Sequence, residues 1–488
     1  DNGLLSFRLL SETIGGSHWY LAMLRDSRAA ARCLCHVLSG ARWTTERLAE
    51  RPESIAWLDG ADELTARDPR TLRTEVRSLL RRRALSGDDG AGLQDWAAEA
   101  VHALMCVRTR ELIRAALADS LDGVDPERTA RILTDATDAV LDGVLTVATG
   151  VVIALREGPE AVAAGPDEAG TWPGALARHS VVAMGRLGGA ETTYASDADV
   201  LFVHEPKSGV DPRAAAEEAD ALARWTVRLL SGARPHSLEV DADLRPEGHH
   251  GPMSRTLDSY AKYYERWSAV WERQALLRAR ACAGDAGLAR AFEELVAPLR
   301  WSPEGLTREG LREIRRLKAR MEAERLPRGT APARHLKLGP GGLSDVEWAA
   351  QVLQLQHAAR VPGLRTTSTL AALDAAQEVG LLSEDEAGDL RQAWLLASRV
   401  RAATVLGTGR DHGARVEVLP DSPREIRLVG RLLGMVPGRE RDLEDLYRRR
   451  ARHARRVVER VVFGDGGPGP EEAGAMGTSG GSAPPRKE

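Results

Sequence analysis

Two aspartates one residue apart are the residues in this sequence best suited to catalysis. Asp197 and Asp199 directly precede the apolar run Val200–Val203, which predicts a buried strand. Residues i and i+2 of a strand share a face, so both carboxylates should point the same way. Two like charges held this close are unfavourable unless a cation lies between them. The spacing therefore predicts a metal site at the start of this strand.

A further carboxylate is expected from the segment Ser237–Leu244, in which acidic and apolar residues alternate. This period of two predicts a strand with Glu239, Asp241 and Asp243 on one face, although a half-solvated strand would give the same alternation. The aspartate pair upstream favours the first interpretation, because a two-metal site needs a carboxylate from a neighbouring strand.

A glycine pair lies between the two predicted strands. Gly188 and Gly189 follow the apolar run Val181–Met184, which predicts another buried strand. Because glycine has no Cβ, the backbone N–H groups of this pair can approach phosphate oxygens. A strand, a glycine turn and an Asp-x-Asp strand in succession are typical of a site that binds metal and phosphate together.

A second glycine-rich loop, His335–Asp345, contains Lys337. Such a loop could contact a triphosphate or simply connect two helices, and alone it is weak evidence. Ser344 or Asp345 is expected to cap a following helix over Val346–Ala359.

The chemistry indicated by the carboxylates is in-line displacement at phosphorus. Two Mg²⁺ ions about 3.5–4 Å apart can activate an attacking hydroxyl and neutralise a triphosphate. Mg²⁺ prefers oxygen ligands, which three aspartates supply. The sequence contains neither a P-loop nor the kinase signature set, which argues against those phosphoryl-transfer classes.

Helices are expected to position this site, because apolar residues recur at helical spacing over most of the chain. Asp125 and Asp211 should begin two of the helices, and Trp267–Arg280 should be helical, with three arginines near the acidic residues. The region before residue 165 shows no polar constellation and is expected to be a scaffold or partner surface. The predicted class is α+β, a mostly helical chain with a small mixed sheet. Its predicted parts are a helical region at 1–165, a catalytic domain at 166–300, a helical bundle at 301–463 and a disordered tail at 464–488.

Composition limits the partners. Charged residues make up 28%, hydrophobic residues 43% and the net charge is −4, as in ordinary soluble proteins and unlike nucleic-acid-binding ones. No uninterrupted apolar run approaches the ~18 residues of a membrane span, so no membrane association is expected. Four cysteines fit a reducing, cytoplasmic compartment. The chain begins with Asp1 rather than methionine, so we expect it to be a fragment of something longer.

Four stretches in combination carry a resemblance to a known family. The first, M-G-R-L-G-G-A-E-T-T-Y-A-S-D-A-D-V-L-F, starts at Met184, and the others are L-E-V-D-A-D-L-R-P-E-G, W-E-R-Q-A-L-L-R-A-R and K-L-G-P-G-G-L-S-D-V-E-W. The first two resemble the nucleotidyltransferase fold shared with DNA polymerase beta. Together the four resemble the glutamine-synthetase adenylyltransferase/adenylyl-removing enzyme over about residues 35–460. That family has two tandem catalytic halves, and this chain, with one Gly-Gly…Asp-x-Asp, looks like the adenylylating carboxy-terminal half.

The resemblance implies transfer of AMP from ATP to a tyrosine hydroxyl of glutamine synthetase, with release of pyrophosphate. Free tyrosine has a pKa of ~10, so a metal or a carboxylate must promote its ionisation. By resemblance, Asp197 and Asp199 hold two Mg²⁺ ions and Asp241 completes the site, with Glu239 or Asp243 as weaker candidates. The residues expected to contact the nucleotide are Gly188, Gly189, Ser196, Arg186, Arg245 and Lys337.

Where that family usually has lysine, this chain has Arg186, which keeps the charge and changes the donor geometry. The full-length family also removes AMP by phosphorolysis and answers to PII signalling proteins, which makes a PII protein a candidate second partner. Three alternatives stay open: a PII-uridylylating enzyme, an RNA tailing enzyme, and a silent regulator that only docks glutamine synthetase. The acidic balance counts against RNA, and the intact Asp-x-Asp counts against a silent regulator.

Overall fold

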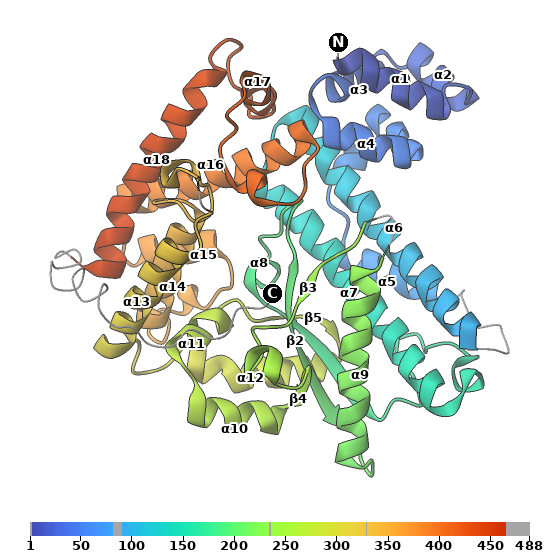
Figure 1. The fold of residues 1–488 in the computed structure, drawn as a ribbon, viewed down its shortest axis with the longest axis vertical. Helices are drawn as coiled ribbons and strands as arrows, with labels where there is room; N and C mark the ends of the chain where they lie inside the picture. The colour runs from blue at the N-terminus through green and yellow to red at the C-terminus, as the bar shows by residue number, and fades with distance from the viewer. Residues whose placement is uncertain (1, 82–89, 234–235, 328, 465–488) are drawn as a thin grey trace.

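The computed structural model describes residues 2–81, 90–233, 236–327 and 329–464. A small sheet lies between two groups of helices, one from each end of the chain (Figure 1). The tail predicted from residue 464 lies outside the described residues except for Gly464. As predicted, the described chain before the sheet is helical apart from turns and short connections: α1 (Asn2–Ile14), α2 (His18–Asp26), α3 (Arg28–Gly40), α4 (Arg42–Glu50), α5 (Pro69–Arg81), α6 (Gly90–Asp122) and α7 (Pro126–Glu157).

The sheet is mixed, which confirms the predicted α+β class. Its order is β3-β2-β1-β5, with β4 paired to β2 off this path. β1 runs antiparallel to β2 and β5, whereas β2 runs parallel to β3 and β4. The strands are β1 (Ala177–Ala183), β2 (Ala198–Pro206), β3 (Val240–Asp241), β4 (Ser254–Thr256) and β5 (Arg280–Gly284), and the helices among them are α8 (Gly185–Gly188), α9 (Pro212–Ser231), α10 (Leu257–Trp267), α11 (Val270–Leu276) and α12 (Ala286–Arg300).

The two faces of the sheet belong to different hydrophobic clusters, because successive strand residues point to opposite sides. Val200 and Phe202 of β2 pack with α7 and α9. Leu201 and Val203 pack with tyrosines of α10 and with Phe292 of α12. Both central strands are therefore covered on both faces, which explains their continuous apolar runs.

The helices after the sheet form a second group on its other side (Figure 1). One hydrophobic cluster joins α3, α4 and α6 to helices beyond residue 340, so the cores cross the predicted limits of the helical parts. The helices of this group are α13 (Arg308–Glu324), α14 (Leu343–His357), α15 (Thr369–Glu378), α16 (Glu384–Thr408), α17 (Pro423–Leu432) and α18 (Leu443–Val458).

Two predicted helix starts are confirmed with their capping contacts. Asp125 accepts hydrogen bonds from the backbone N–H groups of residues 127 and 128 at the start of α7. Asp211 accepts one from Ala214 N at the start of α9. In both helices proline follows the cap, where its missing N–H costs nothing.

The predicted strand over Ser237–Leu244 is wrong in length, since β3 contains only Val240 and Asp241. The Asp241 side chain accepts a hydrogen bond from Asp243 N at 2.7 Å. This contact forms an Asx turn, in which an aspartate side chain accepts a hydrogen bond from the backbone N–H two residues later. The turn ends the strand directly after Asp241, so the alternating pattern does not continue as a strand.

The predicted helix over Trp267–Arg280 is confirmed only over α11 (Val270–Leu276). α10 ends at Trp267, α11 is short, and the chain enters β5 at Arg280. The short strand β4 was not predicted either. Both strands are brief and β5 is rich in alanine, so their pairing with β1 and β2 comes from tertiary contacts rather than local preference.

The strongly apolar character of α7 is explained by its burial in the core. By length and composition this helix could cross a membrane, yet 94% of its most apolar window is buried inside the structure. A core helix surrounded by protein meets the same criteria. The helix packs on α5, α6, α9 and β5, which places it beside the sheet.

Candidate functional site

Asp199 and Asp241 lie opposite each other where β2 and β3 begin to pair. The two residues are register partners across these parallel strands, as are Ala198 and Val240 just before them. Asp197 precedes β2 by one residue and is exposed. The structure thus brings together the three carboxylates expected to hold metal, although their ligand role stays a prediction.

The electrostatics of Asp199 show that these carboxylates act on one another. Burial, together with the negative charges of Asp197 and Asp241, raises the pKa of Asp199 to about 6. The positive charge of Lys337 works in the opposite direction and lowers this pKa. A carboxylate whose charged form is this unfavourable is suited to a site that gains a cation.

Gly185 leaves room beside Asp199 that no other residue would leave. Its φ is +51°, and a Cβ at this position would collide with the Asp199 carboxylate oxygen Oδ2. Met184 N donates to Asp199 O at 2.8 Å, which holds the two backbone segments together. Gly185 directly follows the apolar run Val181–Met184 in the sequence, and its close approach to Asp199 comes from tertiary structure.

Gly188 and Gly189 make hydrogen bonds within their own turn, and their contact with phosphate stays a prediction. Gly188 N donates to Met184 O at 2.6 Å and Gly189 N donates to Gly185 O at 3.1 Å, so both N–H groups serve the single turn of α8. A Cβ on Gly188 would collide with the backbone oxygen of Arg278. Close packing against the segment before β5 therefore accounts for this glycine in the present conformation.

Ser196 and Arg245, both expected at the nucleotide, make local contacts. The Ser196 hydroxyl accepts a hydrogen bond from Thr193 N at 2.9 Å and closes the turn before Asp197. Arg245 donates to Ala242 O at 2.8 Å and to Asp243 Oδ1 at 3.0 Å. Asp243 is thus committed to an arginine of its own loop, whereas Asp241 lies opposite Asp199.

The loop of Lys337 reaches the carboxylates from the second helical group. Lys337 is exposed, and its charge acts on Asp199 and on Glu417. Leu336 N donates to Glu417 O at 2.7 Å, which fixes the loop against the segment after α16. This loop does more than connect two helices, because it carries a positive charge to the site.

The predicted cap of the next helix is wrong, since α14 begins at Leu343 with Gly342 before it. The Asp345 carboxylate instead accepts from Gly341 N at 2.7 Å and pairs with Lys318 and Arg455. These buried contacts hold the glycine-rich loop against α13 and α18.

Arg186 connects the catalytic segment to α14. Its Nη2 donates to Glu347 Oε1 at 2.9 Å, while its Nη1 is buried and has no hydrogen-bond partner among the described residues. Since Arg186 directly follows Gly185, this free nitrogen lies on the segment that touches Asp199. The geometry suits an anion contact at the site.

The chemistry of the donors fits a divalent cation, but the present side-chain positions do not form a ready cage. Among the described ranges no group of three or more His, Cys, Asp or Glu residues is placed to hold a metal ion. The Asp241 side chain points into its own turn, toward Asp243 N. Rotation of that side chain toward Asp199 would complete an all-oxygen set of the kind Mg²⁺ prefers.

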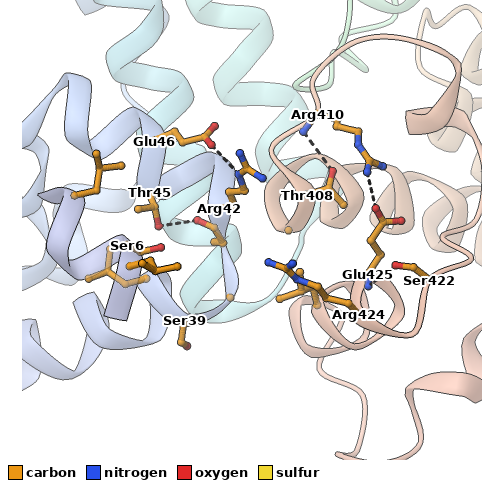
Figure 2. A pocket seen from close by; sticks show the side chains of 17 residues that line it. Ser6, Ser39, Arg42, Thr45, Glu46, Thr408, Arg410, Ser422, Arg424 and Glu425 are labelled. Atoms are coloured by element: carbon orange, nitrogen blue, oxygen red, sulfur yellow. Dashed lines mark hydrogen bonds and ion pairs between the residues drawn. The ribbon is translucent and has the colours of Figure 1, made fainter. Parts of the chain in front are cut away.

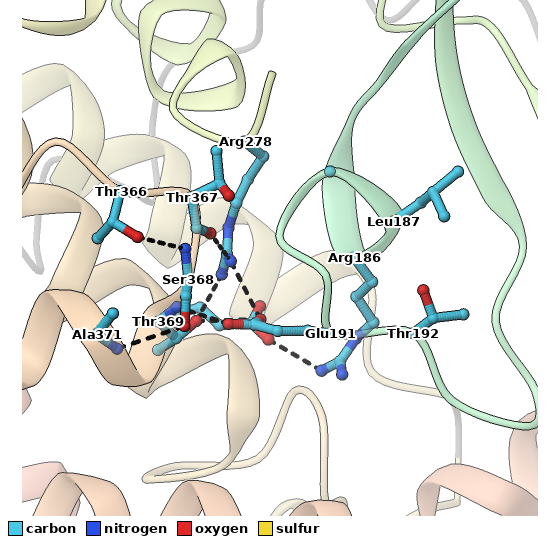
Figure 3. A network of polar contacts seen from close by, with 12 residues as sticks. Arg186, Leu187, Glu191, Thr192, Arg278, Thr366, Thr367, Ser368, Thr369 and Ala371 are labelled. Carbon is cyan, nitrogen blue, oxygen red and sulfur yellow. Dashed lines mark hydrogen bonds and ion pairs between the residues drawn. The ribbon is translucent and has the colours of Figure 1, made fainter. Parts of the chain in front are cut away.

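A buried cluster around Glu191 supports the site from the side of α15 (Figure 3). Glu191 accepts from Thr369 N at 2.6 Å, at the first residue of α15, and from Arg278 Nη1 at 3.1 Å. Arg278 also donates to Thr367 O and to Thr369 Oγ1. Sequence analysis placed Arg278 near acidic residues without identifying Glu191 as its partner, because 87 positions separate the two in the chain.

A cavity among the described residues lies away from the carboxylates. It has a volume of about 580 Å³ and opens between α1, α3, α4, α16 and α17 (Figure 2). Arg42 and Arg410 there pair with Glu46 and Glu425. The carboxylate site is identified by its chemistry and backbone register, and this cavity plays no part in it.

Two family models and several curated proteins are similar to this chain. The family model described as glutamate-ammonia ligase adenylyltransferase matches residues 31–295, and that described as GlnD PII-uridylyltransferase matches residues 313–461. Three curated relatives are each named bifunctional glutamine synthetase adenylyltransferase/adenylyl-removing enzyme. They are 46% identical over 468 residues (Streptomyces coelicolor), 44% over 467 (Leifsonia xyli) and 43% over 467 (Mycobacterium avium). The matches cover 95% of this chain and 45%, 42% and 44% of the relatives, so the chain spans somewhat under half of their length.

Proposed function

The chain belongs to the glutamate-ammonia ligase adenylyltransferase family, and we propose on that premise that it transfers AMP from ATP to a tyrosine hydroxyl of glutamine synthetase. The observation that carries this proposal is the meeting of Asp197, Asp199 and Asp241 at one end of the sheet. A relative's name supplies the acceptor protein, and the carboxylates supply the chemistry.

In the proposed reaction, the acidic residues bind metal and the basic residues contact phosphate. Asp197, Asp199 and Asp241 would hold two Mg²⁺ ions, which when bound would promote ionisation of the phenol and neutralise the triphosphate. Lys337 brings positive charge to Asp199, and Arg186 follows Gly185, which touches Asp199; both would orient the phosphates for in-line attack. The phenolic oxygen forms a bond to the α-phosphorus as pyrophosphate leaves.

A second candidate is uridylylation of a PII protein, favoured by the family match over residues 313–461. That match covers α13 to α18 and contains none of the three carboxylates. It therefore says little about which nucleotide or acceptor the catalytic sheet uses. Regulation by PII and a cytoplasmic location are likewise proposals.

The test supplies purified chain, Mg²⁺ and labelled ATP or UTP to unmodified glutamine synthetase and, separately, to a PII protein. We expect label from ATP on glutamine synthetase only, and none with Asp199→Asn. Label from UTP on the PII protein would overturn the proposal in favour of the second candidate. Absence of label from every mixture would support a docking protein without activity.

The direction of the reaction is tested by feeding adenylylated glutamine synthetase with orthophosphate and no pyrophosphate. The described chain shows one carboxylate site, and pyrophosphate is that site's own product, so slow reversal by pyrophosphate is expected. Rapid release of ADP with orthophosphate would assign AMP removal, rather than addition, to this chain.

A further inference from the structure

The turn between α8 and β2 is held by side chains of the helices that precede the sheet. This turn, residues 187–194, leads directly into Asp197 and Asp199. Its middle and end are contacted by buried side chains of α7 and α6, and its beginning is contacted by Arg280 of β5, which Asp138 of α7 holds. The expectation that the region before residue 165 lacks a polar constellation is therefore wrong.

The end of the turn is fixed by Tyr194. Its hydroxyl donates to Asp119 Oδ2 of α6 at 2.9 Å, and both side chains are buried. Asp119 is held in turn by Thr129 Oγ1 at 2.7 Å and by Arg128 at 3.1 Å. The Tyr194 ring also packs on Trp43 of α4, with 5.4 Å between ring centroids. A fully satisfied carboxylate thus holds the residue three positions before Asp197.

The beginning of the turn is fixed by Arg280. Its guanidinium donates to Leu187 O at 2.9 Å and to Gly188 O at 3.3 Å. The same guanidinium makes two hydrogen bonds to the carboxylate of Asp138 on α7, at 2.6 and 3.0 Å. Asp138 is buried, so this bidentate contact fixes where the arginine can lie.

The middle of the turn meets the same face of α7. Thr134 Oγ1 and Thr192 Oγ1 are 2.8 Å apart. Thr134, Asp138 and Asp142 follow one another at intervals of four, so they lie in a row along the helix. Asp142 Oδ1 accepts from Gly284 N at 2.9 Å and extends the row to the end of β5.

We propose that Asp119 and Asp138 are positioning residues, through which α6 and α7 place the turn that carries Asp197 and Asp199. This inference rests on the proposed function of those two carboxylates. In this way α6 and α7 would affect the activity of Asp197 and Asp199 by fixing the position of the turn that precedes them. The reason is geometric: a catalytic group displaced by about 1 Å can lose a large part of its effect.

The central experiment is a double-mutant cycle of Tyr194→Phe and Asp119→Asn, each of which removes part of one hydrogen bond and little volume. Rates of AMP transfer are measured with thermal unfolding of each variant. We expect kcat to fall at least tenfold in each single variant, with a smaller change in KM for ATP. The double variant should be no worse than the more severe single one, because both remove the same contact.

Tyr260→Phe is the matched control. The Tyr260 hydroxyl is also buried and donates to Phe202 O at 3.2 Å, in β2 but away from the turn. This variant should keep its kcat even where its thermal stability falls. If Tyr194→Phe and Tyr260→Phe change kcat equally, or only in proportion to lost stability, the positioning role is overturned.

The Arg280 contact provides an independent arm. Arg280→Lys keeps the charge but cannot reach Asp138 and two carbonyl oxygens at once, so it should lower kcat while the protein stays folded. Arg280→Ala in the presence of free guanidinium ion should recover part of that loss. The proposal is contradicted if Arg280→Ala has a native melting profile but no transfer activity, and guanidinium restores none of that activity at any concentration.

A measurement without acceptor separates this inference from the proposed function. Binding of Mn²⁺ and ATP to the chain is followed by the paramagnetic signal of the metal, which needs no glutamine synthetase. Tyr194→Phe and Asp119→Asn should weaken Mn²⁺ binding relative to Tyr260→Phe. If the unchanged chain binds Mn²⁺ but modifies no protein, the proposed function is wrong. The positioning inference is then still tested by comparing Mn²⁺ binding among these three variants.

Discussion

Asp199 of β2 and Asp241 of β3 are register partners across two parallel strands. Their proximity is therefore set by backbone pairing rather than by side-chain rotamers. β3 ends directly after Asp241, where the aspartate turn reverses the chain. Asp241, rather than Glu239 or Asp243, is therefore the residue of this segment that pairs with Asp199, because the pairing of β2 and β3 ends there.

The first prediction compares the acidic residues of that segment. Asp241→Asn should lower the transfer rate at least a hundredfold, the order expected when a group that supports transition-state charge is lost. Asp243→Asn should change the rate less than threefold, because Asp243 is exposed and pairs with Arg245. Steady-state rates with saturating ATP and Mg²⁺ decide the matter, and equal losses in both variants would contradict the assignment.

A second prediction concerns stability and pH in metal-free buffer. The folded protein raises the pKa of Asp199 from 3.8 to about 6, so the folded state binds the proton more tightly than the unfolded chain. This contribution to stability is complete below pH 4 and disappears as pH rises through 6. Asp199→Asn should therefore gain stability over the unchanged protein as pH rises, by on the order of 2 kcal/mol at pH 7.

That gain is measured as the difference in free energy of unfolding between the two proteins at pH 4, 5, 6 and 7, with a chelator present. Taking the difference removes the other carboxyl groups that titrate in the same range. A difference that stays constant across this window would show that Asp199 has an ordinary pKa. Added Mg²⁺ should stabilise the unchanged protein and have less effect on Asp199→Asn.

A third prediction concerns the loop from the second helical group. Lys337→Met should lower kcat/KM for ATP about tenfold, the effect of losing one charge-assisted contact of roughly 1.5 kcal/mol. Lys337→Arg should recover most of that loss. Because Lys337 is exposed, neither variant should change the unfolding midpoint, and a large loss of stability would indicate a structural role instead.

The fourth prediction tests the cluster in Figure 3. Glu191 and Arg278 are 5% and 7% exposed, and their charges are 3.1 Å apart. Glu191→Ala leaves a buried guanidinium without its carboxylate and should cost about 3–5 kcal/mol in the free energy of unfolding. Urea unfolding measures this loss. Glu217→Ala, which breaks the exposed pair with Arg213, should be near neutral.

Local patterns in the sequence were sufficient for several features. The starts of α7 and α9 were predicted because an aspartate followed by proline caps a helix through contacts within three residues. β1 and β2 were predicted because strands buried on both faces are continuously apolar. The Asp197 and Asp199 pair was identified from its spacing at the start of an apolar run, although Asp197 lies one residue before β2 rather than within it.

Other features depend on partners far apart in the chain, and local reasoning failed for them. β5 was missed, because its alanine and glycine residues show little strand preference until β1 pairs with them. The packing of Gly188 against the backbone of Arg278 likewise cannot be read from its neighbours in sequence. The polar row on α7 went unnoticed because its partners lie beyond the next strand.

The sequence by itself was enough to single out the acidic pair, the glycine-rich segments near it and the family that these stretches resemble. Only the tertiary structure decided how these groups are held. Asp119 and Asp138 acquire their roles from Tyr194 and Arg280, residues that reach them solely after the helices pack against the sheet. Local preferences act over a few residues, whereas a buried polar contact is defined by whatever the fold places opposite it.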